Sequence, residues 1–405
     1  MRSSSKTRKV GGGVALFGLA LLAIIAFSPA ARVTPVVMAQ GATPAFEVDR
    51  LWPKPLPNHW ILGSVTGMAV DGRDHIWLVH RGLDSLGRGN EAGLASSPQG
   101  SEYCCLPAPS VLEFDAAGTL LNQWGGPGQG FEWPVSPGGL AVDDKGNVWI
   151  AAAGPPEPAA AGRNATGGGG GAAGAPGGRA GGAPAGGGGR AGAPPRPQDA
   201  HVLKFSRTGE FLLQIGHAGQ PGAKDSTTGL DRPAALALDA SGSELYVADG
   251  GDNQRVVVFD AATGAFKRQW RGHGMDFARL SCIAVSKDRL VYVCDRKNDR
   301  LQVFNTDGTF VKDVLVSKAT TGNGSVWGVT FSADPRQRFL FVADGQDEKI
   351  WILDRSTLEV VTSFGDGGRQ PGEFYAVGSV AMDSKGNLYT GEGYEGKRLQ
   401  KFVKK

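Results

Sequence analysis

The chain has 405 residues, of which 41% are hydrophobic, so it contains enough apolar material for a sizeable core. Its 63 glycines and 24 prolines favour turns and loops over long helices. The formal net charge is only +3 and no basic face stands out, so we expect no nucleic-acid partner.

Residues 1–39 have the pattern of an export signal. Basic residues between Arg2 and Lys9 precede an apolar run over 14–27, and small residues before Gln40 offer a cleavage site. The alternative is an uncleaved N-terminal anchor, which would be the chain's contact with a membrane. In both cases we expect residues 40–405 to be exported, to the periplasm or the extracellular space.

The body of the chain repeats one pattern in six units. Each unit begins with an apolar strand that ends on Asp or Ser: GMAVD at 67–71, GLAVD at 139–143, ALALD at 235–239, CIAVS at 282–286, GVTFS at 328–332 and SVAMD at 379–383. A second strand such as IWLVH or LYVAD, a third and a fourth follow. Units of four short alternating strands are typical of propeller blades. The sequence therefore predicts an all-β, six-bladed β-propeller with four antiparallel strands per blade.

The sixth unit stops after its third strand, at Phe402. The segment FEVDRLW at 46–52 resembles the other fourth strands and ends on a tryptophan. We predict that it completes the last blade, which would close the ring and remove an exposed sheet edge.

The first two units carry insertions between their second and third strands, at about 83–109 and 154–199. The second insertion is rich in Gly, Ala and Pro and has almost nothing to bury, so we expect it to be disordered. It is either a low-complexity loop or a flexible tether. Loops of this kind open on the face that also carries the inter-blade loops, and we place any ligand site on that face.

Four cysteines fit an oxidising compartment. If the hairpin around Asp288 is centred on that residue, Cys282 and Cys294 face each other, as a disulfide or as two buried thiols. Cys104 and Cys105 are adjacent. Our hypothesis for them is a vicinal disulfide that stiffens the first insertion.

The units resemble NHL repeats, most clearly in LYVADGGDNQRVVVF and VYVCDRKNDRLQVF. Within that group, GSVTGMAVD followed by IWLVHRG resembles the peptidyl-α-hydroxyglycine α-amidating lyases. The resemblance implies a catalytic zinc on three histidines near the propeller axis, with arginines and a tyrosine around it. Zinc suits this chemistry because it lowers the pKa of a bound hydroxyl and polarises a carboxylate.

The zinc ligands that the resemblance implies are absent from this sequence. Their positions read Gly138, Ser281 and Gly378, and the tyrosine position reads Gly251. Glycine offers no ligand atom and serine is a poor zinc ligand, so we predict no metal and no cofactor there. Zinc rebuilt from other residues, or calcium as in gluconolactonase-type propellers, remains the alternative.

The surviving candidates for ligand binding are Arg81, Arg296, His80, Glu392 and Tyr394. Two arginines at the ends of second strands suit a carboxylate or another anion, although packing within the loops is the competing interpretation. By contrast, two Asp–Arg combinations fit the structural pairs of NHL blades: Asp249 with Arg255, and Asp295 with Arg300.

The sequence thus predicts an exported NHL-repeat propeller that binds a small anionic or peptide ligand, or a protein partner, on one face. Whether it is an enzyme is left open. One alternative is an amidating-lyase-like enzyme with an altered metal site, and another is a pure protein-interaction scaffold.

Overall fold

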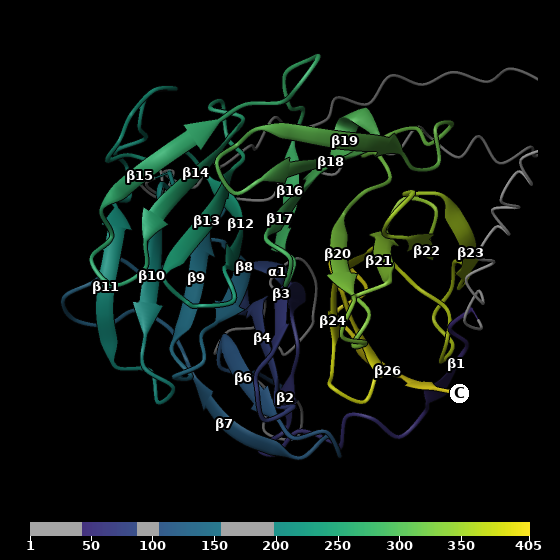
Figure 1. The fold of residues 1–405 in the computed structure, drawn as a ribbon. Coiled ribbons are helices and arrows are strands. Elements are labelled where there is room, and N and C mark those ends of the chain that lie inside the picture. Colours follow the sequence, from purple (N-terminus) through teal and green to yellow (C-terminus); the bar gives the residue numbers. More distant parts are fainter. Residues whose placement is uncertain (1–42, 87–104, 155–197) are drawn as a thin grey trace, which may run out of the picture. The chain divides into compact units, whose positions relative to one another are not determined.

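The computed structural model describes residues 43–86, 105–154 and 198–405. In these residues the chain forms six four-stranded antiparallel sheets, which are the six blades of a β-propeller (Figure 1). The predicted all-β propeller is therefore confirmed, with the first strand of each repeat at one edge of its sheet.

The strands follow the predicted order in every blade. Blades 1 to 3 consist of β3 (Ser64–Val70), β4 (Ile76–Arg81), β6 (Val111–Phe114) and β7 (Leu120–Trp124); β8 (Pro137–Val142), β9 (Val148–Ala152), β10 (His201–Phe205) and β11 (Phe211–Gly216); and β12 (Pro233–Leu238), β13 (Glu244–Asp249), β14 (Arg255–Asp260) and β15 (Phe266–Trp270). Blades 4 to 6 consist of β16 (Leu280–Val285), β17 (Leu290–Asp295), β18 (Arg300–Asn305) and β19 (Phe310–Leu315); β20 (Gly328–Phe331), β21 (Phe339–Asp344), β22 (Lys349–Asp354) and β23 (Val360–Phe364); and β24 (Val377–Met382), β25 (Leu388–Glu392), β26 (Leu399–Lys404) and β1 (Phe46–Asp49).

The first strands of the blades form the inner wall of the ring. Each contacts the first strand of the next blade, in the order β3, β8, β12, β16, β20, β24 and back to β3. The wall therefore closes, and its inner ends meet around a common axis.

The ring closes where blade 6 takes its outer strand from the beginning of the described chain. β1 pairs antiparallel with β26, so Phe46 lies opposite Lys404 and Asp49 opposite Lys401. Phe46 also contacts Phe341 of blade 5, with ring centroids 5.6 Å apart. The predicted closing strand is confirmed, although the strand itself ends at Asp49 and Trp52 continues as a buried residue beyond it.

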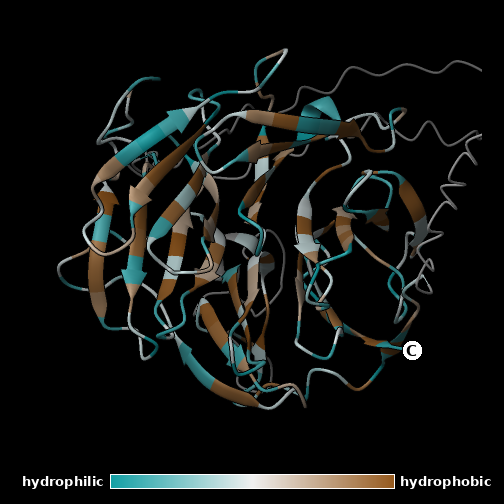
Figure 2. Cartoon of the chain, viewed as in Figure 1, coloured by the Kyte–Doolittle hydropathy of each residue, from teal (hydrophilic) through white to brown (hydrophobic). Residues whose placement is uncertain are grey.

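The core lies between the blades. Among the described residues, buried apolar side chains form six clusters, and each joins two neighbouring blades. The second strands are buried on both faces because each is enclosed by the adjacent blades, whereas outer strands such as β15 are more hydrophilic (Figure 2). This burial explains why second strands such as LYVAD and LFVAD are apolar on successive residues rather than alternating.

Few elements lie outside the blades. A short helix, α1 (Gly82–Leu86), follows β4, a 3₁₀ turn, η2 (Arg296–Asn298), follows β17, and β2 (Trp60–Ile61) pairs in parallel with β5 (Leu106–Pro107). In the described part of the chain no helix has the length and apolar character needed to cross a membrane. The predicted signal at 1–39 lies outside the described ranges, and so does the second insertion predicted at about 154–199, apart from its ends at 154 and 198–199.

Candidate functional site

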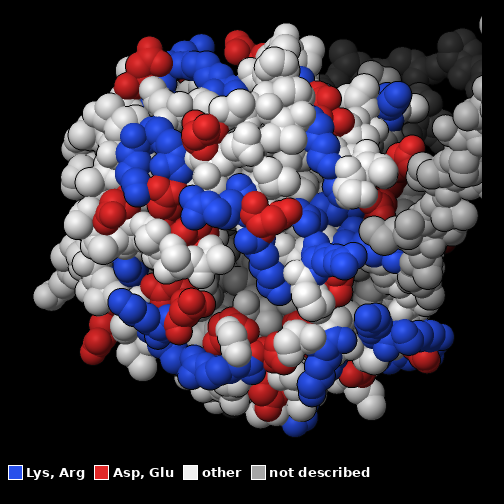
Figure 3. Space-filling model, in the orientation of Figure 1, with Lys and Arg blue, Asp and Glu red and all other residues white. Residues whose placement is uncertain are grey.

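A cavity of about 590 Å³ lies where the first strands begin and the second strands end. All six blades contribute residues to its lining, so it is centred on the propeller axis. Its volume is in the range of small-molecule sites. On the face visible in Figure 3, acidic and basic side chains are interspersed around a central hollow.

One residue from each blade forms a ring in this lining: Thr66, Gly138, Ala234, Ser281, Trp327 and Gly378. In five blades the pairing of the first and second strands shifts register at this point, which is the mark of a β-bulge. A bulge leaves an extra residue outside the ladder and redirects its side chain. The repeated bulge thus explains why these positions face the axis.

Three of the ring residues stand where the resemblance to the amidating lyases implies zinc-binding histidines. A Cβ atom added to Gly138 would lie 2.8 Å from the Cβ of Ala153 and 3.0 Å from the carbonyl oxygen of Ala234, so a histidine has no room there. The Ser281 hydroxyl donates a hydrogen bond to the carbonyl oxygen of Val326 at 2.8 Å. With Gly378 as the third position, the residues do not fit a zinc ion.

Four arginines line the cavity: Arg81, Arg232, Arg279 and Arg296. The first and last are the two that the sequence predicts. Arg296 is buried and its Nε donates to the carbonyl oxygen of Asn323 at 2.9 Å, while Arg279 donates to the Asn323 side chain at 3.0 Å. Blade 4 therefore presents two fixed guanidinium groups to the cavity.

Trp327 occupies the blade 5 position of the ring and is one of the functional candidates that the sequence did not predict. The guanidinium carbon of Arg296 lies 3.1 Å from the centre of a Trp327 ring. The predicted candidate Tyr394 also lines the cavity and meets Trp327 edge-on, with ring centroids 5.9 Å apart. The sequence did contain a signal for it, because Trp327 aligns with Gly138, Ser281 and Gly378 when the repeats are superposed.

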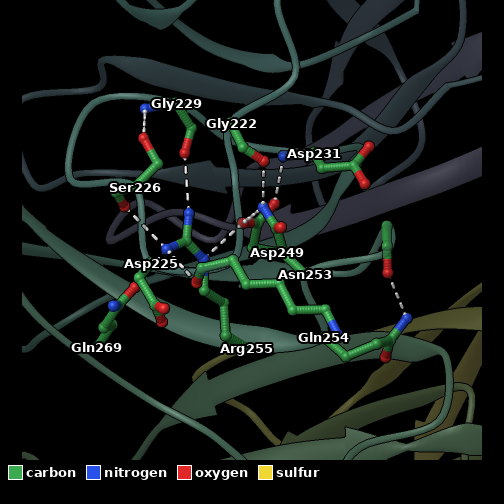
Figure 4. A network of polar contacts seen from close by, with 12 residues as sticks. Gly222, Asp225, Ser226, Gly229, Asp231, Asp249, Asn253, Gln254, Arg255 and Gln269 are labelled. Atoms are coloured by element: carbon green, nitrogen blue, oxygen red, sulfur yellow. Dashed lines mark hydrogen bonds and ion pairs between the residues drawn. The ribbon is translucent and has the colours of Figure 1, made fainter.

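Away from the cavity, a charged pair fixes the loop that leads into blade 3. Arg255 is buried at the start of β14, and its Nε donates to Asp249 at the end of β13 at 2.9 Å. Its other nitrogens donate to the carbonyl oxygens of Ser226 and Gly229, both at 2.8 Å (Figure 4). Asp249 in turn accepts the backbone N–H of Asp231 at 2.6 Å. We call this arrangement the loop staple.

The NHL repeat family matches residues 277–304, which span the first and second strands of blade 4 and most of the third. In that segment Arg300 and Asp295 form the same staple at 2.6 Å. The six-bladed propeller therefore contains an NHL repeat in blade 4. Both Asp–Arg pairs predicted as structural are confirmed as such.

The curated relatives that match this chain have low sequence identity to it. Peptidylglycine alpha-amidating monooxygenase of Rattus norvegicus is 22% identical over 70% of the chain, and the match spans only 24% of that protein. NHL repeat-containing protein 3 of Mus musculus is 30% identical over 41% of the chain and 45% of its own length. A solved structure of unknown function from Bacteroides thetaiotaomicron superposes with a TM-score of 0.52, at 16% identity over 90% of this chain and 77% of that one, and shows the fold alone.

Glu392 belongs to the staple of blade 6 and not to the cavity lining. Its Oε1 accepts hydrogen bonds from Arg398 Nε at 3.0 Å, Arg398 Nη2 at 2.7 Å and Gln400 at 3.0 Å. Burial raises the pKa of Glu392 to about 7, while Arg398 acts in the opposite direction. These donors and the burial of the side chain give Glu392 a structural role in this blade, and a ligand contact by Glu392 stays a prediction.

His80 also serves the propeller as a structural residue. It is fully buried, its Nδ1 accepts the backbone N–H of Gly63 at 3.2 Å, and its Nε2 donates to the carbonyl oxygen of Pro109 at 2.9 Å. Burial lowers the pKa of His80 to about 4, so the ring is neutral near pH 7. Both ring nitrogens are engaged by the backbone and His80 is not part of the cavity lining, so a ligand contact by His80 stays a prediction.

A group of three metal-type ligands occurs among the described residues of the propeller, but at the opposite end of the blades. Asp71, His75 and Glu113 bring ligand atoms within 4.8 Å of one another. The guanidinium of Arg207 from blade 2 already contacts both carboxylates and the His75 ring. Arg207 thus supplies the positive charge for these carboxylates, and the contacts of the four residues join blades 1 and 2.

Cys282 and Cys294 are directly opposite in the pairing of β16 with β17, the register expected for a hairpin centred on Asp288. They are joined in a disulfide with a Cα–Cα distance of 4.9 Å. Cys104 lies outside the described residues, so the vicinal disulfide with Cys105 stays a prediction.

Proposed function

We propose that this NHL propeller is an exported binding protein that holds a small anionic or peptide ligand in its axial cavity, without zinc lyase chemistry. The observation that carries the proposal is the set of four arginines in one cavity whose implied zinc positions hold no ligand side chain. Guanidinium groups bind carboxylates and similar anions through paired, charge-assisted hydrogen bonds.

The geometry around Arg296 supports a binding role. Its side chain is held between the Trp327 ring and the carbonyl oxygen of Asn323, so little conformational entropy remains to be lost when a ligand binds. Arg81 comes from the end of β4, where it pairs with Ser64, another residue of the lining. Export is supported by the basic and apolar pattern of residues 1–39 and belongs to the proposal.

The experiment begins with a thermal-shift panel of carboxylates and short peptides, followed by calorimetric titration of the best ligand. We expect Arg81→Ala and Arg296→Ala each to weaken binding by about 10- to 100-fold, because a hydrogen bond to a charged group contributes about 1.5–3 kcal/mol. Arg289→Ala is the matched control, since Arg289 is exposed and lies outside the cavity lining. Unchanged affinity in both cavity variants would contradict the proposal.

The resemblance of GSVTGMAVD and IWLVHRG to the amidating lyases supports one competing function, a lyase with an altered metal site. It is tested by metal analysis of the purified protein together with a glyoxylate-release assay on a peptide that ends in α-hydroxyglycine. We expect neither stoichiometric zinc nor glyoxylate. Finding both would replace the binding proposal with the lyase.

A further inference from the structure

The charges in the axial cavity are divided between two parts of the ring. All four arginines come from blades 1, 3 and 4, whereas the carboxylates of the lining, Glu348 and Glu395, come from the adjacent blades 5 and 6. Of the arginines, Arg232 is already paired with Asp231 at 3.1 Å and with Asp252 at 2.8 Å. A ligand with one kind of charge would use only one part of this lining. The division of charge points to a ligand that carries both.

Glu348 is the better placed of the two carboxylates. It is half-buried, and its two oxygens accept the backbone N–H groups of Ala376 at 2.8 Å and Val377 at 3.5 Å, which fix its orientation. Within the described ranges, no lysine or arginine is found paired with it. Burial raises the pKa of Glu348, in keeping with a carboxylate that lacks a nearby positive charge. Burying such a group is unfavourable unless a cation compensates it.

Glu395 differs from Glu348 in its exposure and in having an ion-pair partner. Its side chain is 57% exposed and pairs with Lys397 at 2.9 Å. It therefore lies at the mouth of the cavity and already has a partner. This leaves Glu348 as the acceptor for a cationic group of the ligand.

Aromatic side chains of the lining gather in the same part of the ring. Trp327 and Tyr394 meet there edge-on, and Tyr375 directly precedes the residue whose N–H group binds Glu348. Arg296 already lies over the Trp327 ring, and Arg369 lies over the Tyr375 ring at 4.5 Å. Among the described residues no cation lies over the Tyr394 ring, so this ring can favour an ammonium group through its quadrupole and by reducing the contact of that group with water. Blades 5 and 6 thus combine the features of an ammonium site.

We propose that the ligand is a compact zwitterion, an amino acid or a short peptide with a free ammonium group. Its carboxylate lies against the arginines and its ammonium group is bound by Glu348. This inference rests on the proposed function, because it assumes that an anionic ligand occupies the cavity. It adds a second recognition site for the opposite end of that ligand.

The test uses the purified chain and three probes followed by NMR-detected titration: triglycine, N-acetyl-triglycine, which lacks the ammonium group, and triglycine amide, which lacks the carboxylate. We expect triglycine to bind and each capped probe to bind at least tenfold more weakly. Glu348→Gln should weaken triglycine to the level of N-acetyl-triglycine and leave the acetylated probe unchanged. Glu395→Gln, the control at the cavity mouth, should keep the preference for triglycine.

The outcomes separate this inference from the proposed function. If triglycine and N-acetyl-triglycine bind equally and the amide binds more weakly, the zwitterion inference is overturned and anion binding stands. If the amide binds as well as triglycine, both are overturned. If no probe binds at 20 mM, the zwitterion inference is overturned, while the proposed function is decided by its own panel of carboxylates and peptides. Should Glu348→Gln fail to fold, the comparison of probes on the unmodified chain still decides, because it needs no substitution.

Discussion

Single residues at the ends of the second strands determine how each inter-blade loop is held. Asp249 and Asp295 accept loop N–H groups at the ends of β13 and β17, and His80 does so with its Nδ1 near the end of β4. A neutral imidazole can replace a carboxylate here because its second nitrogen donates to the carbonyl oxygen of Pro109. The residue that first suggests chemistry in IWLVHRG is therefore a structural acceptor.

The buried histidine predicts a pH dependence of stability. The pKa of His80 is about 4 in the folded protein and about 6.5 when unfolded. Between these values the unfolded chain binds more protons than the folded protein. The contribution of neutral His80 to the unfolding free energy is therefore complete above about pH 6.5 and is lost as the pH falls to 4. A shift of this size corresponds to about 3 kcal/mol. Urea unfolding at several pH values should show that His80→Gln removes this part of the acid sensitivity.

His217→Gln is the control for that series, because the His217 side chain is 63% exposed. It should keep the pH profile of the unmodified protein. Identical profiles for His80→Gln and the unmodified chain would show that the ring of His80 can be protonated in the folded state.

At the scale of elements, the loop staples and the closing strand stabilise different parts of the blades: the staples hold the inter-blade loops, and the closing strand covers an outer edge. The staples of Arg255, Arg300 and Arg398 fix the loops that lead into blades 3, 4 and 6. β1 instead covers the outer edge of β26 and brings Trp52 against Tyr389, with ring centroids 5.0 Å apart. Closure of the ring therefore depends on a segment far from blade 6 in sequence.

The closing strand gives a prediction for chain truncation. A chain that starts at Pro53 loses β1 and the buried Trp52, while a chain that starts at Thr43 keeps both. We expect the shorter chain to lose at least about 3 kcal/mol of unfolding free energy, since removing a buried tryptophan side chain alone costs about 3–5 kcal/mol. Denaturant unfolding of the two chains measures the difference, and equal midpoints would contradict closure by β1.

At the scale of the whole molecule, the ring brings residues from all six blades to one cavity. Arg81 was foreseeable because it ends a second strand, and Arg296 and Tyr394 because they come just after second strands. Arg232 and Arg279 were not, since each stands before a first strand in a loop whose path depends on the staples. Trp327 and Glu348 were missed for a related reason, as their roles appear only beside residues of other blades.

The sequence by itself determined the repeat, the order of strands and the closing segment, because strand alternation and turn residues are local patterns that recur six times. It also showed that the implied zinc histidines are replaced. Only the tertiary structure decided which polar residues face the axis, because bulges and loop staples set side-chain direction. It placed Glu392 and His80 in the framework and collected four arginines, two carboxylates and Trp327 around one cavity. The charged residues of the cavity come from several blades, so the sequence of a single repeat does not show how they are combined.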